Sequence, residues 1–289
     1  MRGKNRLLEM IERGHVPLGL QCFTGNPALI EVMGHTGFDW IMVDTEHSGN
    51  NPRALEDTMR VIDNSGLVPL VRVPDLHDET AIRRALEAGA EGLLLPLVKT
   101  ASDVRRAADA AFFPPKGKRG ICPSLRAAGY NIMSFPEYAK WNNSEVLLIP
   151  MFEHPEGVEN VEEICAMEEV KMIVFAPGDL AFLLGEGMDM RAPRVSEAYK
   201  KVMAAAKRHD VKVIGGPIND PTPETCRKAL DDGVSVFCLG LDTMGFRRFC
   251  EYAVAALNSG VEGTRFNRPA APPGAFPARL AKSLVMPTV

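Results

Sequence analysis

Short apolar runs recur along the chain, and most are followed by a longer stretch with helical periodicity. Short apolar runs bounded by polar or turn residues are typical of strands that are buried on both faces. Eight such runs predict strands: Pro17–Cys22, Trp40–Asp44, Val68–Val73, Gly92–Leu97, Val146–Met151, Met172–Phe175, Val213–Gly215 and Val236–Leu239. Because helical stretches separate them, the strands are expected to run parallel with crossover connections.

Several of the helical stretches begin with a recognisable start signal. A small polar side chain accepts a hydrogen bond from the first free backbone N–H groups, and proline suits the first helical turn. These signals are Asn26-Pro27, Asn51-Pro52, Asp78, Ser102 and Thr222-Pro223. Gly34, Gly89 and Gly233 are expected to end three helices in the left-handed conformation.

Eight strand–helix units are the number at which a parallel sheet closes into a (β/α)8 barrel. The alternative is an open doubly wound sheet, but no G-x-G-x-x-G or G-x-x-x-x-G-K-[ST] motif follows an early strand. We therefore predict an α/β protein with a single (β/α)8 barrel domain over residues 1–260. The Pro-rich residues 261–289 are expected to form a C-terminal extension, either mobile or packed on a neighbouring subunit.

Composition narrows the class of protein. The 289 residues include 33 Lys and Arg against 37 Asp and Glu, for a net charge of −4, which argues against a nucleic-acid-binding protein. No apolar run approaches the roughly 18 residues of a membrane span, and Glu9 and Glu12 interrupt the N-terminal apolar stretch, unlike a secretory signal. Six scattered cysteines without C-x-x-C spacing predict buried free thiols in a reducing cytoplasm.

One segment departs from the repeat. Residues Phe112–Trp141 are rich in proline and glycine and are interpreted as a long connection from a strand to the following helix. Long ordered loops in compact folds are usually functional. We expect this segment to contribute to substrate selection, alone or with a neighbouring subunit.

Carboxylates follow two consecutive predicted strands. Glu153 follows the fifth strand and Asp179 the sixth, and the carboxyl ends of barrel strands meet at one mouth. Two unpaired carboxylates there would repel each other, and Mg²⁺ or Mn²⁺ relieves this by binding one or two of them together with water and substrate oxygens. The alternative is that each acid caps the next helix or pairs with a surface lysine.

A histidine and an arginine occupy the ends of the second and third strands. His47 follows Glu46 directly and Asp44 by three residues, so a carboxylate is available to orient an imidazole that can move protons near neutral pH; a hydrogen-bonded loop histidine is the alternative. Arg72 lies in an apolar strand, where a cation is costly unless it is paired. Its expected partner is a carboxylate or a substrate oxyanion.

These residues stand within motifs that resemble the HpcH/HpaI family of class II, pyruvate-specific aldolases. The motifs are GFDWIMVDTEHS (Gly37–Ser48), VRVP (Val71–Pro74), the stretch Glu87–Gly120, FEHPEGVENVEEI (Phe152–Ile164), FAPGDLAFLLG (Phe175–Gly185) and GVSVFCLGLDT (Gly233–Thr243). The resemblance implies a (β/α)8 barrel whose last helix is exchanged between subunits. It also implies a homo-oligomer, usually a hexamer built as a trimer of dimers.

The resemblance further implies a divalent metal, Mg²⁺, Mn²⁺ or Co²⁺, held by Glu153 and Asp179. The backbone amides of Gly178 and Asp179 would receive the carboxylate of pyruvate, and Arg72 would contact its keto oxygen. The substrates implied are a 4-hydroxy-2-oxo acid on one side and pyruvate plus an aldehyde on the other.

The resemblance implies that His47, coupled to Asp44, carries out the proton transfers. It also implies that Glu46 holds a water molecule bound to the metal. Breaking the carbon–carbon bond leaves negative charge on the pyruvate fragment, which nearby positive charge must stabilise. None of the assigned residues is a lysine, so no Schiff base is expected.

Two positions depart from the family pattern near the expected pyruvate and aldehyde. The family usually has Gln where this chain has Met151, and Trp where it has Gln21. Two alternatives therefore stay open. One is decarboxylation of oxaloacetate followed by carbon–carbon ligation, as in citrate- or macrophomate-forming relatives, and the other is a non-catalytic binding barrel.

Overall fold

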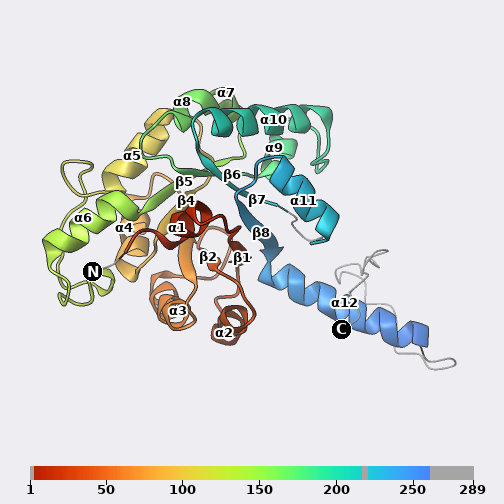
Figure 1. Ribbon diagram of the computed structural model, residues 1–289, viewed down its shortest axis with the longest axis horizontal. Coiled ribbons are helices and arrows are strands. Elements are labelled where there is room, and N and C mark those ends of the chain that lie inside the picture. The colour runs from red at the N-terminus through yellow and green to blue at the C-terminus, as the bar shows by residue number, and fades with distance from the viewer. Residues whose placement is uncertain (1–2, 217–220, 261–289) are drawn as a thin grey trace.

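The computed structural model describes residues 3–216 and 221–260 of the chain. Eight parallel strands form one closed barrel in chain order, and the last strand pairs with the first. Helices surround the barrel (Figure 1). The predicted (β/α)8 fold is therefore confirmed, and the open sheet is wrong. The predicted extension 261–289 lies outside the described residues.

The strands agree with the eight apolar runs to within two residues at each end. They are β1 (Leu18–Cys22), β2 (Trp40–Asp44), β3 (Val68–Arg72), β4 (Gly92–Leu95), β5 (Leu147–Phe152), β6 (Met172–Phe175), β7 (Lys212–Gly215) and β8 (Val236–Leu241). The helices are α1 (Arg6–Glu12), α2 (Pro27–His35), α3 (Pro52–Asn64), α4 (Glu79–Ala88), α5 (Ala101–Ala111), α6 (Phe135–Glu145), α7 (Pro155–Glu159), α8 (Val161–Cys165), α9 (Pro177–Leu183), α10 (Pro193–Arg208), α11 (Pro223–Asp231) and α12 (Asp242–Gly260).

Four of the five predicted helix starts are confirmed: the side chains of Asn26, Asn51, Asp78 and Thr222 cap α2, α3, α4 and α11 by accepting from backbone N–H groups. The prediction at Ser102 is wrong, because α5 begins at Ala101 after Thr100. Thr100 and Asp103 form a capping box, in which each side chain accepts from the other residue's backbone. This reciprocal pair starts the helix earlier than a lone serine would.

Two of the three glycines predicted to end helices adopt the left-handed conformation. Gly89 caps α4 with φ 116°, and Gly233 follows the last residues of α11 with φ 99°. Gly34 does not end α2, which continues to His35. Its role is close packing, because a Cβ atom there would lie 2.5 Å from the carbonyl oxygen of Ser65.

Successive side chains of a strand point alternately into the barrel and out toward the helices. This alternation determines which residues reach the site. On β2 and β3, Trp40, Met42, Val68 and Leu70 belong to the cluster inside the barrel, while Ile41, Val43 and Val71 pack outside against the helices. The same period of two brings Asp44 and Arg72 to the inside at the carboxyl ends. The barrel interior is therefore apolar along most of the strand length and charged at the carboxyl ends of the strands, which form the mouth.

Helix α1 closes the opposite end of the barrel. Leu7 is fully buried in the interior cluster. The Asn5 side chain donates to the carbonyl of Glu91, directly before β4, and to that of Glu145, two residues before β5. The amino-terminal end of the barrel is therefore covered by α1, and the charged residues lie at the carboxyl-terminal end.

The interpretation of Phe112–Trp141 as a strand-to-helix connection is wrong. The segment lies between α5 and β5, so it is a helix-to-strand connection at the amino ends of the strands. Arg126 donates to the carbonyl of Ala88 and pairs with Asp63, at the ends of α4 and α3. The segment therefore lies across the barrel from the mouth, because it follows a helix and not a strand.

The six cysteines are unpaired, as expected, but Cys122 and Cys250 are exposed and only Cys22, Cys165 and Cys238 are buried. Burial raises the pKa of the Cys165 thiol to about 12. In the described ranges, no helix is both long and apolar enough to span a bilayer.

Candidate active site

A buried ion pair joins the ends of β2 and β3. The Arg72 Nε atom lies 2.7 Å from Oδ1 of Asp44, and Arg72 Nη1 lies 3.1 Å from Oε2 of Glu46. The Asp44 side chain is fully buried and that of Arg72 is 8% exposed. A buried guanidinium is tolerated only when it is paired in this way, so the expectation that Arg72 binds carboxylates is confirmed.

Asp44 also holds the backbone of the loop that follows β2. Its two carboxylate oxygens accept hydrogen bonds from the backbone N–H groups of Glu46 (3.2 Å) and His47 (2.9 Å). The Thr45 hydroxyl donates to the carbonyl of Arg72 at 2.6 Å. Asp44 therefore fixes both the arginine and the loop that carries the histidine.

The His47 imidazole lies beside Glu46 and not beside Asp44. Its Nε2 atom is 3.5 Å from Oε2 of Glu46, and the side chain is 63% exposed. The expected coupling of His47 to Asp44 is thus made through the His47 backbone, because Arg72 and two amides occupy the Asp44 carboxylate. Burial raises the pKa of Glu46, and the Arg72 guanidinium opposes that rise.

Glu153 is the buried carboxylate on the other side of the mouth. It is 3% exposed, and its Oε1 atom accepts a hydrogen bond from the backbone N–H of Leu97 at 2.7 Å. Burial raises the pKa of Glu153, the Leu97 amide opposes the rise, and the negative charges of Asp179 and Glu46 add to it, so that the pKa is about 7. Asp179 is exposed on α9, and its charge acts on both Glu46 and Glu153.

These carboxylates suit a hard divalent cation. Among the described residues, one oxygen of Glu153 has no hydrogen-bond partner and Asp179 makes no ion pair. No group of three or more His, Cys, Asp or Glu with metal-site geometry occurs in residues 3–216 and 221–260, so an all-protein cage is not present there. Two carboxylates with open positions for water and substrate fit an ion of the Mg²⁺ type.

The remaining predicted substrate residues lie around the same mouth. Gly178 and Asp179 are in the first turn of α9, where the capping position is held by Ala176, which has no side-chain acceptor for their amides. Met151 is 4% exposed inside the barrel. The Gln21 side chain contacts the Cys238 sulfur at 3.8 Å. The predicted site residues thus come from strand ends, from the loops just beyond them and from the first turn of α9.

Two residues of the mouth were not predicted from sequence. Leu97 adopts a left-handed conformation with φ 52° and supplies the amide that binds Glu153. Phe23 places its ring 5.7 Å from Cζ of Arg72. Backbone donation does not depend on the kind of side chain and leaves no signal in the sequence, whereas an aromatic residue directly after the first strand is a signal that was available.

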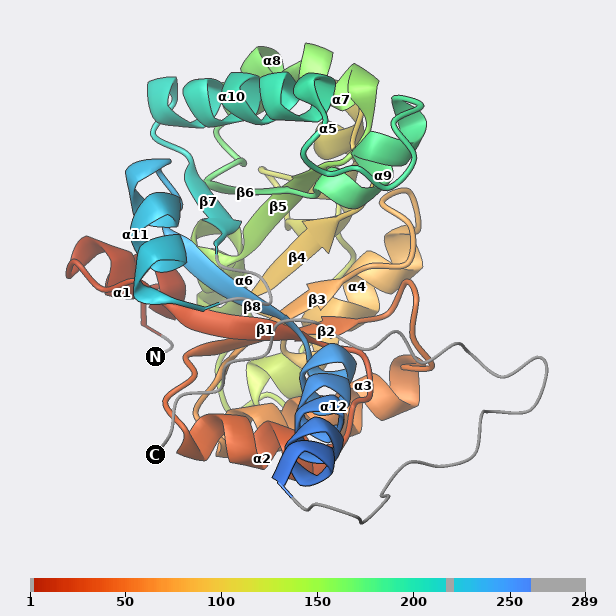
Figure 2. The ribbon, with the colours of Figure 1, turned by 90° about the vertical axis from the view of Figure 1, so that its right-hand side faces the viewer.

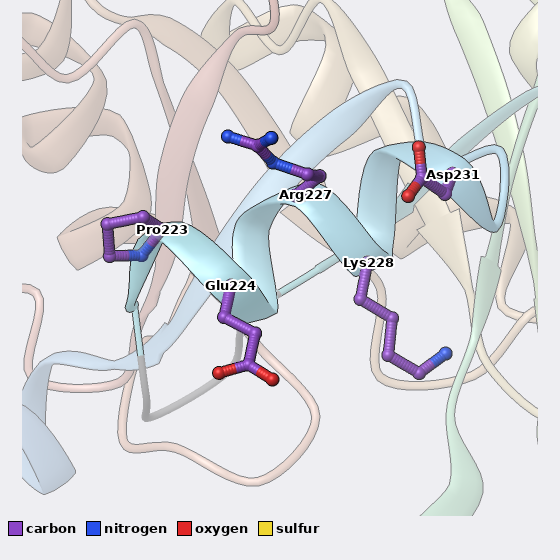
Figure 3. Close-up of a pocket in the computed structure, with 5 residues that line it drawn as sticks. All are labelled: Pro223, Glu224, Arg227, Lys228 and Asp231. Atoms are coloured by element: carbon purple, nitrogen blue, oxygen red, sulfur yellow. The ribbon is translucent and has the colours of Figure 1, made fainter.

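A surface hollow on the outside of the barrel is unrelated to these groups. Figure 3 shows it along α11, where every lining residue comes from that one helix. The residues are Pro223, Glu224, Arg227, Lys228 and Asp231. None of them belongs to the strand ends that carry the site, so we place no reaction there.

Comparison with known proteins identifies the family of the chain. The HpcH/HpaI aldolase/citrate lyase family matches residues 19–248. A 5-keto-4-deoxy-D-glucarate aldolase of Klebsiella pneumoniae is 32% identical over 245 residues, which are 84% of this chain and 93% of that protein. The chain therefore belongs to the HpcH/HpaI aldolase/citrate lyase family.

Solved structures agree on the fold. A family member from Burkholderia cenocepacia superimposes with a TM-score of 0.80 at 30% identity, covering 88% of this chain and all of that one. The citrate synthase SbnG superimposes with a TM-score of 0.78 at 25% identity, covering 87% and 96%. Proteins described as an aldolase and as a citrate synthase thus both resemble this chain.

The raised pKa of Glu153 predicts a pH-dependent stability of the metal-free protein. Between its ordinary pKa of 4.5 and about 7, the folded state binds more protons at this carboxyl than the unfolded state, so stability falls as pH rises through that range. At pH 8 the penalty is about 3 kcal/mol, and it vanishes below pH 4.5. Glu153→Gln removes the ionisation and keeps an acceptor for the Leu97 amide.

Urea unfolding in EDTA at pH 5 and pH 8 tests this. We expect Glu153→Gln to be more stable than the native chain at pH 8 and similar to it at pH 5. Glu156→Gln, at an exposed position on α7, is the control and is expected to follow the native chain at both values. An equal effect of Glu153→Gln at both pH values would contradict a buried, titrating Glu153.

Proposed function

We propose that this chain is a divalent-metal-dependent aldolase that interconverts a 4-hydroxy-2-oxo acid with pyruvate and an aldehyde. The observation that carries the proposal is the grouping of a buried Arg72, its carboxylate partners and the Glu153–Asp179 pair at one mouth of the barrel. Membership of an aldolase family supports it. So does the relative described as a 5-keto-4-deoxy-D-glucarate aldolase.

The 2-oxo acid end of the substrate binds where its negative charge is best compensated. The amides of Gly178 and Asp179 at the start of α9 have no side-chain cap, and unpaired amides in the first turn of a helix favour a carboxylate. A Mg²⁺-type ion held by Glu153 and Asp179 would act as a Lewis acid on the keto group and orient the 2-oxo acid. Gly178 has open space where a Cβ would lie, so substrate can approach the backbone there.

Arg72 stabilises the negative charge that develops during cleavage. Asp44 and Glu46 hold its Nε and Nη1 atoms, while Nη2 has no hydrogen-bond partner among the described residues. That free N–H₂ group can donate to the keto oxygen as the C3–C4 electrons move into the enolate of pyruvate. Because the guanidinium is already held in place, little reorganisation is needed when the charge appears.

His47 moves the protons. Its exposed imidazole faces the open mouth beside Glu46, within a loop that Asp44 keeps rigid. The imidazole accepts the proton of the C4 hydroxyl as the C3–C4 bond breaks and C4 becomes an aldehyde. The imidazolium, stabilised by Glu46, then returns a proton to C3, which completes pyruvate.

A second candidate function shares this enolate. The resemblance to the citrate synthase SbnG, together with Met151 and Gln21 at positions where the family usually has Gln and Trp, favours oxaloacetate decarboxylation followed by carbon–carbon ligation. In that case carbon dioxide leaves from C3 in place of an aldehyde. The substrates, and not the charged groups, distinguish the two reactions.

The aldolase proposal predicts metal-dependent release of pyruvate. EDTA should abolish release from 4-hydroxy-2-oxo acids, and Mg²⁺, Mn²⁺ or Co²⁺ should restore it. Glu153→Gln and Asp179→Asn should each lower kcat by more than about a hundredfold, because the metal contributes several kcal/mol to the barrier. A lactate-dehydrogenase-coupled assay measures the pyruvate.

Two controls make this assay decisive. Glu156→Gln should leave the rate unchanged. Full activity of both site variants in chelator would contradict the proposed metal site, and release of pyruvate from oxaloacetate alone would favour the second function. A chain that releases pyruvate from neither substrate would be a binding barrel.

His47→Ala should lower kcat by roughly 10² to 10⁴-fold while metal affinity changes little. The imidazole is expected to serve proton transfer and not to bind the ion. Stopped assays at saturating metal give kcat, and Mn²⁺ titration by electron paramagnetic resonance gives the affinity. His35→Ala, at an exposed position on α2, is the control. A loss of Mn²⁺ affinity as large as that of Glu153→Gln would refute this role.

We also propose that the chain works as a homo-oligomer in which a second copy covers α12. After β8 this helix projects away from the barrel (Figure 1 and Figure 2). It exposes four large apolar side chains: Phe246, Phe249, Val254 and Leu257. An exposed apolar patch of this kind usually marks an interface.

Light scattering tests the assembly. We expect the mass of a hexamer, or at least of a dimer, and Phe249→Glu should shift it to the mass of one chain, because a buried unpaired carboxylate opposes association. Lys207→Glu, at an exposed position on α10, should leave the mass unchanged. A native chain that is monomeric at micromolar concentration would contradict the proposal.

A further inference from the structure

Asp242, the first residue of α12, binds the connection that leaves β1. Its Oδ1 atom accepts a hydrogen bond from the backbone N–H of Phe23 at 3.1 Å, and Oδ2 accepts from the N–H of Thr24 at 3.0 Å. The Thr24 hydroxyl donates to the same Oδ2 at 2.6 Å, and the Thr243 N–H to Oδ1 at 2.7 Å. One carboxylate thus accepts four hydrogen bonds. It links the start of α12, which follows β8, to the connection that follows β1.

The connection held by Asp242 carries the aromatic residue that lies over Arg72. The Phe23 ring centroid is 5.7 Å from Cζ of the guanidinium. Asp44 and Glu46 hold Arg72 through Nε and Nη1, and the ring supplies an apolar wall on another side. A cation over an aromatic ring is attracted to it, and the attraction strengthens where water is excluded.

A carboxylate is the side chain that this position requires. Three of its four donors are backbone N–H groups. Those of Phe23 and Thr24 are kept in any substitution of these residues by an L-residue other than proline. An asparagine would offer a single acceptor oxygen and would turn an NH₂ group toward one of these donors. Alanine would leave the amides of Phe23 and Thr24 without this partner.

We propose that Asp242 is a positioning residue: by holding Phe23 over Arg72, it keeps the guanidinium in the orientation in which it meets the 2-oxo acid. Phe23 is the link, and Arg72 remains the group that contacts substrate. The inference rests on the proposed function of Arg72. It also implies that the start of α12 and the active site are one connected unit.

Kinetics of four variants test the link. We expect Asp242→Ala and Phe23→Ala each to lower kcat by about tenfold to a hundredfold, as loss of alignment does, with a smaller change in KM. Asp242→Asn should fall between Asp242→Ala and the native chain, and Phe23→Tyr, which keeps the ring, should stay close to native. The double variant Asp242→Ala/Phe23→Ala should be no slower than either single variant, because both remove the same link.

Asp232 offers a matched control at the other end of β8. It caps α11 and pairs with Lys228 at 2.6 Å, so Asp232→Ala also removes a carboxylate that accepts hydrogen bonds next to this strand. We expect its kcat to be native. Losses that multiply in the double variant, or an equal loss in Asp232→Ala, would overturn the proposal.

A readout that needs no turnover separates this proposal from the proposed function. Phenylglyoxal modifies exposed guanidinium groups, and peptide mass mapping follows Arg72, whose side chain is 8% exposed in the native chain. Modification should be faster in Asp242→Ala and Phe23→Ala, and native in Phe23→Tyr and Asp232→Ala. An unchanged rate in Asp242→Ala would overturn the positioning role even if the enzyme is slow. A native chain that releases no pyruvate would refute the proposed function instead, and the labelling would still decide the role of Asp242.

Discussion

The burial of Arg72 is the constraint on which the site depends. A guanidinium at the inner end of a barrel strand loses its hydration, and it is stable there only because Asp44 and Glu46 compensate its charge. Asp44 in turn accepts hydrogen bonds from the backbone of the next loop. The carboxylate that compensates the buried cation therefore also fixes the backbone position of His47. One electrostatic requirement therefore organises Arg72, His47 and the loop between them.

The other side of the mouth carries an excess of negative charge. Glu153 is desolvated and lies near Asp179 and Glu46, so its pKa is raised to about 7. The single guanidinium is already shared by two carboxylates. A divalent ion would relieve this excess, and the same ion would serve a 2-oxo acid. Under the proposed function, stability without metal and chemistry with metal would thus place opposite demands on the same carboxylate.

Much of this could be predicted from the chain. The eight apolar runs defined the strands, and the position of Arg72 within one of them required an acidic partner. The partner of the His47 imidazole could not be predicted, because Glu46 and Asp44 are both near in sequence and only the turn after β2 decides which side chain faces the ring. The Leu97 amide was equally hidden, since a backbone donor has no sequence signature.

Local pattern determined the secondary structure, the parallel barrel and the set of charged residues at its mouth, because periodicity and capping act over a few residues. Only the tertiary structure decided that Phe112–Trp141 lies across the barrel from that mouth, and that Asp242 reaches the loop after β1. The first follows from the position of the segment after α5 and not after a strand, whereas the second depends on how the sheet closes. Closure brings the last strand beside the first, and contacts between residues more than two hundred positions apart follow from that geometry and not from any local preference.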